Sequence, residues 1–169
     1  MLTGDMLRRS SQRFPNKIAI IRDDVRLTYS ELDAGANQFA NALVGTGCAK
    51  GAKVAIVSRN LPEYGVVFFG AARSGLVLVN ISILYAPDEL EYVLTKSDSE
   101  ILVFDAQFAD KVKAVASRCP KLAHLVSIAA TEVRGATAFT EFRRVGTAGP
   151  PPGTPGPRPS PPIEGETRR

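Results

Sequence analysis

The sequence has few of the residue types that build metal centres. Its 169 residues include one histidine, His124, and two cysteines, Cys48 and Cys119. Neither cysteine belongs to a Cys-x-x-Cys pair, so the sequence excludes a zinc site and predicts no bound metal. Composition alone leaves a nucleophilic Cys–His pair open. However, Cys48 follows a predicted helix among glycines and Cys119 precedes a proline, positions that favour buried or surface thiols over a nucleophile.

Long apolar runs and clustered charge are also absent. No segment reaches the roughly 20 apolar residues that a membrane-spanning helix needs, and the N-terminus lacks the apolar core of a signal peptide. We therefore expect a cytoplasmic protein without a membrane span. Lys and Arg number 21 against 17 Asp and Glu. The basic residues are scattered rather than interleaved with aromatics, which argues against nucleic-acid binding.

The common phosphate-binding loops are missing as well. No Gly-x-Gly-x-x-Gly follows a predicted strand, and no Gly-x-x-x-x-Gly-Lys-Ser/Thr occurs. Gly45 and Gly47 follow a predicted helix, where glycine typically serves as a cap. The Gly-Thr-Ala-Gly stretch at 146–149 is followed by three prolines. No helix N-terminus can therefore stand behind it to supply amide groups and a dipole.

The remaining polar candidates have structural explanations. Asp23 and Asp24 lie in a predicted turn, and acidic residues in a first helical turn complement the helix dipole. Ser58 follows a strand but lacks the Gly-x-Ser-x-Gly elbow. Three further acidic residues lie in the first turn of a predicted helix: Asp88, Glu89 and Glu91. His124 precedes a predicted strand, and Tyr29 and Tyr64 are expected at the edge of the core. The residues by themselves thus assign no catalytic, cofactor-binding or metal-ligating position.

What the chain has in excess is proline near its end. Eight of its twelve prolines lie between Pro150 and Pro162. Proline donates no backbone hydrogen bond and fixes φ, so this density excludes helix and central strand. We expect a folded unit over residues 1–142 and an extended, disordered Pro/Gly-rich tail over residues 143–169.

Before that tail, strands and helices alternate. Continuous apolar runs are typical of strands buried on both faces, and they occur at Val54–Val57, Leu76–Val79, Ile101–Phe104 and Leu125–Ile128. A helix capped by Ser30 and Asp33 is expected before the first of these runs, and one capped by Asn60 after it. A short helix over 5–13 and a hairpin of 17–21 with 25–28 open the chain. This alternation predicts an α/β fold with a parallel sheet flanked by helices.

Several segments, taken together and in order, resemble the AMP-forming adenylating enzymes, the superfamily of acyl-CoA synthetases, luciferases and peptide-synthetase adenylation domains. They are Phe14–Ile20, Leu27–Leu32, Gly51–Ile56, Asn60–Glu63, Gly75–Asn80 and Glu89–Leu94. The resemblance covers roughly residues 7 to 128 and is greatest to fatty-acyl-CoA synthetases. Ala52 stands where the family usually has Asp, and Ser82-Ile83 replaces a common Asn-Pro.

The resemblance implies what an intact member does and what this chain lacks. Intact members use ATP, Mg²⁺ and CoA to convert a carboxylate into an acyl-adenylate and then a thioester. Their Thr-Ser-Gly-Thr-Thr-Gly-x-Pro-Lys loop and small C-terminal catalytic domain do not occur here. The chain therefore resembles a truncated N-terminal portion, catalytically inactive alone and binding no cofactor.

Two alternatives remain open at this point. The Pro/Gly/Arg-rich tail fits either a frameshifted gene or a genuine linker. The folded part fits either a fragment or a stand-alone interaction module derived from the family. As a fragment it should expose apolar surface, which favours self-association or chaperone binding.

Overall fold

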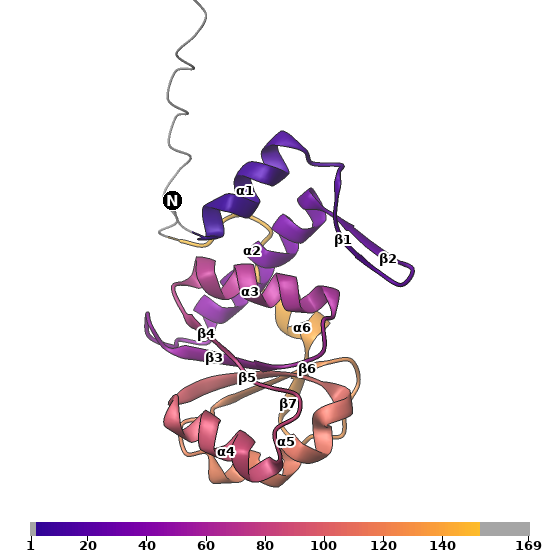
Figure 1. Ribbon diagram of the computed structural model, residues 1–169. Coiled ribbons are helices and arrows are strands. Elements are labelled where there is room, and N and C mark those ends of the chain that lie inside the picture. Colours follow the sequence, from indigo (N-terminus) through magenta and orange to yellow (C-terminus); the bar gives the residue numbers. More distant parts are fainter. Residues whose placement is uncertain (1–2, 153–169) are drawn as a thin grey trace, which may run out of the picture.

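The computed structural model describes residues 3–152 (Figure 1). The N-terminal part consists of α1 (Thr3–Arg13), β1 (Ile18–Arg22), β2 (Val25–Thr28), α2 (Tyr29–Gly45), β3 (Lys53–Val57) and α3 (Pro62–Ser74). It is followed by β4 (Val77–Asn80), α4 (Pro87–Lys96), β5 (Ser99–Asp105), α5 (Ala109–Val115), β6 (His124–Ile128), β7 (Ala136–Ala138) and α6 (Phe139–Arg144). Two 3-10 turns, Ala106–Phe108 and Ala116–Arg118, flank α5.

Five strands form a parallel sheet in the order β4-β3-β5-β6-β7. β3 is an interior strand, with Ala55 opposite Val79 of β4 on one side and Leu102 of β5 on the other. Strands β1 and β2 form a separate antiparallel hairpin. The predicted parallel α/β fold is therefore confirmed. Two of the three runs that we expected to be central strands, Val54–Val57 and Ile101–Phe104, form the interior strands β3 and β5. The third, Leu76–Val79, was wrongly expected to be central, because it corresponds to β4, displaced by one residue, at the edge of the sheet.

Both faces of the sheet are covered by helices. In Figure 1, α1, α2, α3 and α6 lie on one side, and α4 and α5 lie on the other. Alternate residues of each strand point to opposite faces. Val54 and Ile56 accordingly join the core under α2 and α3, whereas Ala55 and Val57 join the core under α4 and α5. Burial on both faces explains why these strands read as unbroken apolar runs.

Helix starts differ from the sequence prediction at two places. The cap of helix α2 lies two residues earlier than predicted, because Thr28 and Glu31 form the capping box rather than Ser30 and Asp33. The Glu31 carboxylate accepts from the Thr28 backbone N–H at 2.8 Å, and Thr28 Oγ1 accepts from the Glu31 N–H at 3.2 Å. Helix α3 has Leu61 at its N-cap with no side-chain hydrogen bond, so Asn60 is not the cap.

The folded part extends past the last predicted strand. Strand β7 pairs in parallel with β6, and α6 follows directly. Helix α6 packs on α2 through aromatic rings: Phe39 stacks on Phe139 at 5.4 Å between centroids and touches Phe142 at 5.5 Å. Helix α6 runs into the range expected to be tail, and residues 147–149 hydrogen-bond to α2. Residues 153–169 lie outside the described part of the chain.

Candidate functional site

The carboxyl edge of the parallel sheet contains its topological switch point. Neighbouring strands β3 and β5 lead into helices on opposite faces, α3 and α5. In open α/β sheets, ligands bind in the crevice outside the carboxyl ends of such strands. The residues at this point are Ser58 and Arg59, which follow β3, and Asp105, which ends β5.

An ion pair bridges the two strand ends. Arg59 Nε lies 3.3 Å from Asp105 Oδ2. The Asp105 side chain is only 8% exposed, whereas that of Arg59 is 51% exposed. Asp105 also accepts from the backbone N–H of Gln107 at 3.2 Å and from its side-chain amide at 2.7 Å. The buried carboxylate therefore holds a half-exposed guanidinium at the edge.

A shallow hollow of about 430 Å³ lies beside this point, between the hairpin and the start of α3. Its walls come from two segments that are distant in sequence: Ile20, Ile21, Arg22, Asn60, Leu61, Tyr64 and Gly65. Arg22 donates to the Asn60 carbonyl at 2.8 Å. Gly65 allows the close approach, since a Cβ there would lie 2.8 Å from Ile20 Cδ1.

The hydroxyl groups near the edge are engaged in structural hydrogen bonds. Ser58 Oγ donates to the Arg59 carbonyl at 2.8 Å, and Ser58 is buried. The Tyr64 hydroxyl donates to Asn80 Oδ1 at 2.6 Å, and burial raises the pKa of this phenol. A donating hydroxyl that lacks an adjacent base is a poor nucleophile. These hydroxyls are therefore not arranged for nucleophilic catalysis.

The other candidates from the sequence lie on separate elements in structural roles. Gly45 ends α2, and Gly47 has the left-handed φ of 79° that glycine tolerates. Asp23 occupies the hairpin turn with φ 49°. The Glu89 carboxylate accepts from the Ala86 N–H at 2.8 Å at the start of α4. Tyr29 begins α2, Asp24 lies between β1 and β2, Asp88 and Glu91 pair with Arg118, and His124 begins β6.

The thiols do not form a reactive pair with each other. Cys48 and Cys119 are both free. Burial raises the pKa of each thiol, which keeps both protonated near neutral pH. Among residues 3–152, no group of three or more His, Cys, Asp or Glu side chains could hold a metal ion. Nor is any helix in this range long and apolar enough to cross a membrane.

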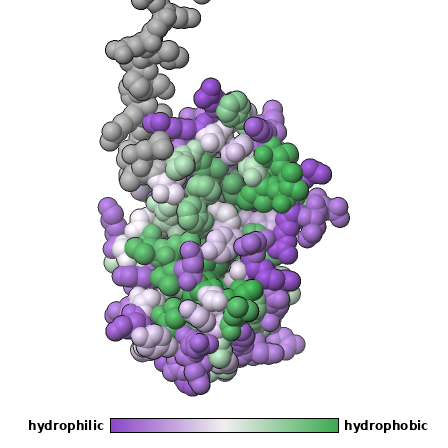
Figure 2. Space-filling model, in the orientation of Figure 1, coloured by the Kyte–Doolittle hydropathy of each residue, from purple (hydrophilic) through white to green (hydrophobic). Residues whose placement is uncertain are grey.

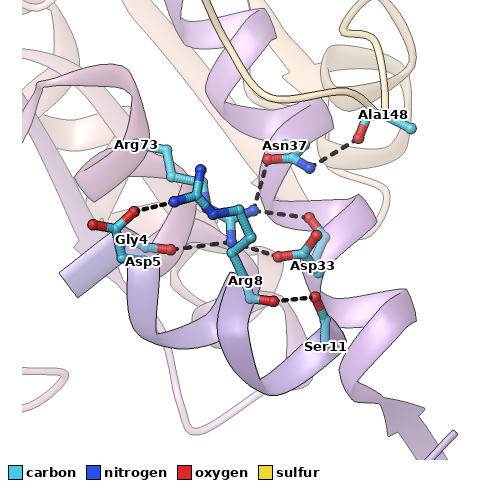
Figure 3. A network of polar contacts seen from close by, with 8 residues as sticks. All are labelled: Gly4, Asp5, Arg8, Ser11, Asp33, Asn37, Arg73 and Ala148. Carbon is cyan, nitrogen blue, oxygen red and sulfur yellow. Dashed lines mark hydrogen bonds and ion pairs between the residues drawn. The ribbon is translucent and has the colours of Figure 1, made fainter. Parts of the chain in front are cut away.

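Sequence reasoning missed two polar centres. The Arg59–Asp105 pair had a usable signal, because each residue comes at the end of an apolar strand run and parallel strands end at one edge. The second centre lies between α1, α2 and α3, where Arg73 contacts Asp33, Asn37 and the Gly4 carbonyl (Figure 3). No local pattern marks Arg73, since its partners lie 36 to 69 residues away.

The parallel sheet, covered by helices on both faces and with the Arg59–Asp105 ion pair at its switch point, defines an α/β unit. The sequence model of one family, the AMP-binding enzymes, matches residues 7–164. The chain belongs to that family, as the resemblance predicted.

Relatives with assigned activities are acyl-CoA ligases. A medium/long-chain-fatty-acid–CoA/3-oxocholest-4-en-26-oate–CoA ligase of Mycobacterium marinum is 33% identical over 119 residues, which cover 70% of this chain and 22% of the ligase. A long-chain-fatty-acid–CoA ligase of Mycobacterium tuberculosis is 35% identical over 114 residues, or 66% of this chain and 23% of that protein. The chain thus spans less than a quarter of the length of these relatives.

Solved structures give the same result. An anthranilate CoA ligase in complex with anthranoyl-AMP superposes with a TM-score of 0.84 at 28% identity, covering 88% of this chain and 29% of that one. The N-terminal domain of a Mycobacterium tuberculosis protein, FACL13, superposes with a TM-score of 0.79 at 28% identity, covering 90% and 38%. The described fold is therefore that of the N-terminal region of acyl- and aryl-CoA ligases.

Proposed function

We propose that this chain corresponds to the N-terminal portion of an ATP-dependent, AMP-forming carboxylate–CoA ligase, of the fatty-acyl-CoA synthetase type. Its 169 residues act as scaffold rather than as catalyst. The observation that carries this proposal is the pair of coverages: the family match takes in residues 7–164, yet the aligned part is 22% of a fatty-acid–CoA ligase. In an intact ligase, ATP, Mg²⁺ and CoA would act together with a carboxylic acid.

The described residues do not fit ATP and Mg²⁺. Adenylyl transfer depends on donors aimed at the phosphate groups and on a cation held by carboxylates or phosphates. Here the Gly-Thr-Gly stretch at 45–47 follows a helix rather than preceding one. The glycine-bearing stretch 146–149 lies along α2, where its carbonyls are bound by Asn37 and Asn41. This part of the chain therefore offers no nucleotide cradle.

The proposal predicts that the purified 169-residue chain does not catalyse ATP–pyrophosphate exchange with saturated fatty acids of any length. Electrostatic stabilisation by hydrogen-bond donors aimed at the phosphates supplies most of the rate of such a transfer. The described residues offer no such donors, so we expect no exchange. The assay should run beside the Mycobacterium marinum ligase as a positive control. Exchange that is reproducible and disappears in an Arg59→Ala variant would contradict the proposal, because that loss would locate catalysis within these residues.

A second candidate function, a stand-alone interaction module, draws on one observation. The hairpin and the residues before it expose apolar side chains: Phe14 is 46%, Ile21 61% and Val25 49% exposed. Figure 2 shows a hydrophobic area where Figure 1 places β1. In the fragment reading, another part of a ligase covers these side chains. In the module reading, a separate partner does.

A further inference from the structure

We infer that residues 146–149 form a latch on α2, and that Asn37 and Arg73 couple this latch to helix α1. The latch is the Gly-Thr-Ala-Gly stretch directly after α6. It lies within the range in which the sequence predicts only an extended, solvated tail. Three independent contacts support its docking, and one buried cation connects it to the start of the chain.

The first contact is steric. At Gly146 a Cβ would collide with the backbone carbonyl oxygen of Gln38 and would lie 3.0 Å from the backbone nitrogen of Ala42. Backbone atoms in the middle of a helix cannot move aside as the end of a flexible side chain can. The chain therefore approaches α2 so closely at this point that only glycine fits.

The other two contacts are side-chain amides one helical turn apart on α2. Asn41 Nδ2 lies 2.9 Å from the Thr147 carbonyl and 2.9 Å from the Gly149 carbonyl. Asn37 Nδ2 donates to the intervening Ala148 carbonyl at 2.9 Å. Residues four apart share one face of a helix. Their amides can therefore bind successive carbonyls of an extended segment that runs along that face.

Arg73 fixes the direction of the Asn37 amide. A guanidinium only donates, so the group that faces it must be the amide oxygen, and Asn37 Oδ1 accepts from Arg73 at 2.7 Å. The Asn37 NH₂ group consequently points away from Arg73 and toward the latch (Figure 3). Asn37 is itself buried.

The same guanidinium holds helix α1. The Arg73 Nη2 atom donates to the Gly4 carbonyl at 3.3 Å and to Asp33 Oδ1 at 2.5 Å. The Arg73 side chain is only 5% exposed, so these contacts operate in a low dielectric and are strong. Releasing the latch would leave the Asn37 NH₂ group without its carbonyl and admit water to Arg73. Water weakens the remaining contacts, including the one to α1.

The latch lies close to the other end of the described chain. Figure 1 shows the yellow end of the described chain beside the start of α1. The two ends of the folded unit thus share one polar centre, and an opening at one end is transmitted to the other. The coupling requires no movement of the sheet, because its contacts join only the latch and helices α1, α2 and α3, which lie on the same face.

The test is hydrogen exchange on the full chain with two matched variants. Gly146→Val introduces a side chain where a Cβ would collide with the backbone of α2. Gly149→Val introduces the same side chain where a Cβ would meet nothing within 4 Å. We expect Gly146→Val to raise exchange in α1 by about fivefold, the order of one lost hydrogen bond, and to leave α4 unchanged. Tryptic cleavage after Arg144 should accelerate in parallel, while cleavage after Arg134 should not.

If Gly146→Val does not fold, Asn41→Asp replaces it, with Asn60→Asp as its control, since Asn60 is exposed and lies away from the latch. Faster cleavage after Arg144 with faster exchange in α1 supports the coupled latch. Faster cleavage with unchanged α1 overturns the coupling. Equal behaviour of the disruptive variant and its control overturns the latch itself.

Discussion

At the scale of single residues, short polar contacts decide where elements begin. Thr28 and Glu31 start α2 because glutamate is long enough to reach back to the Thr28 N–H, whereas the expected Ser30–Asp33 pair would begin the helix two residues too late. Hydrogen bonds from the Thr28 backbone N–H, and then from its hydroxyl, lower the pKa of Glu31 below its ordinary value of 4.5.

This shift predicts a pH-dependent contribution to stability. A carboxyl whose pKa is lower in the folded state stabilises the fold above its unfolded pKa. That stabilisation is lost as the pH falls through the lower, folded value. Thermal melts between about pH 3 and about pH 7 should show the wild type losing more stability in acid than Glu31→Gln does. Identical pH profiles for the two proteins would refute the assignment of the capping box.

At the scale of elements, α2 and α3 pack directly against each other over the sheet. Gly70 of α3 faces α2 at a point where a Cβ would lie 2.7 Å from Phe39 Cδ1 and 3.2 Å from the Ala36 carbonyl. Phe39 is fully buried and also packs on Phe139 of α6. The Phe39 side chain of α2 thus lies between α3 and α6, so it has little freedom to move aside.

Gly70→Ala should therefore destabilise the fold, even though alanine favours helix. Overpacking of this kind costs about 1 to 3 kcal/mol, which exceeds the roughly 1 kcal/mol gained in helix propensity. Gly45→Ala is the matched control, because a Cβ at Gly45 meets nothing within 4 Å. Urea denaturation should show a lower midpoint for Gly70→Ala and an equal or higher one for Gly45→Ala. A stabilised Gly70→Ala protein would show that the helices are not in close contact.

At the scale of the whole molecule, the sheet buries its apolar surface, whereas the hairpin exposes apolar side chains to water. Helices protect both sheet faces, so the apolar surface left to water lies mainly elsewhere, with Ile21 and Val25 on the hairpin prominent in it. Exposed apolar patches mark contacts with another protein surface or cause aggregation. The fragment reading therefore predicts self-association through the hairpin.

Size exclusion with a hydrophobic dye tests this prediction. The wild type should elute above the monomer size and bind dye, and the double variant Ile21→Lys, Val25→Lys should shift toward monomer with less dye bound. Val44→Lys is the control, because Val44 is 44% exposed but lies at the end of α2, outside the hairpin. A wild type that is monomeric, binds little dye and melts cooperatively would favour the stand-alone module instead.

The central strands could be predicted from the sequence by itself, and so could the family. A strand buried on both faces needs apolar residues at every position, so Val54–Val57 and Ile101–Phe104 carry their structure in their own residues. The absence of an assigned active site likewise followed from missing motifs, and it stays a prediction.

Only the tertiary structure decided the short edge strand, the polar contacts between distant residues and the close approach at Gly146. Strand β7 has three residues without an apolar pattern and exists because β6 pairs with it. Arg59 and Asp105 meet because parallel strands end at one edge, and Arg73 reaches Gly4 across 69 residues because three helices pack together. Gly146 reads as flexible in the sequence, but the neighbouring backbone of α2 makes it a fixed point. These features depend on groups distant in the chain, whose positions local periodicity does not encode.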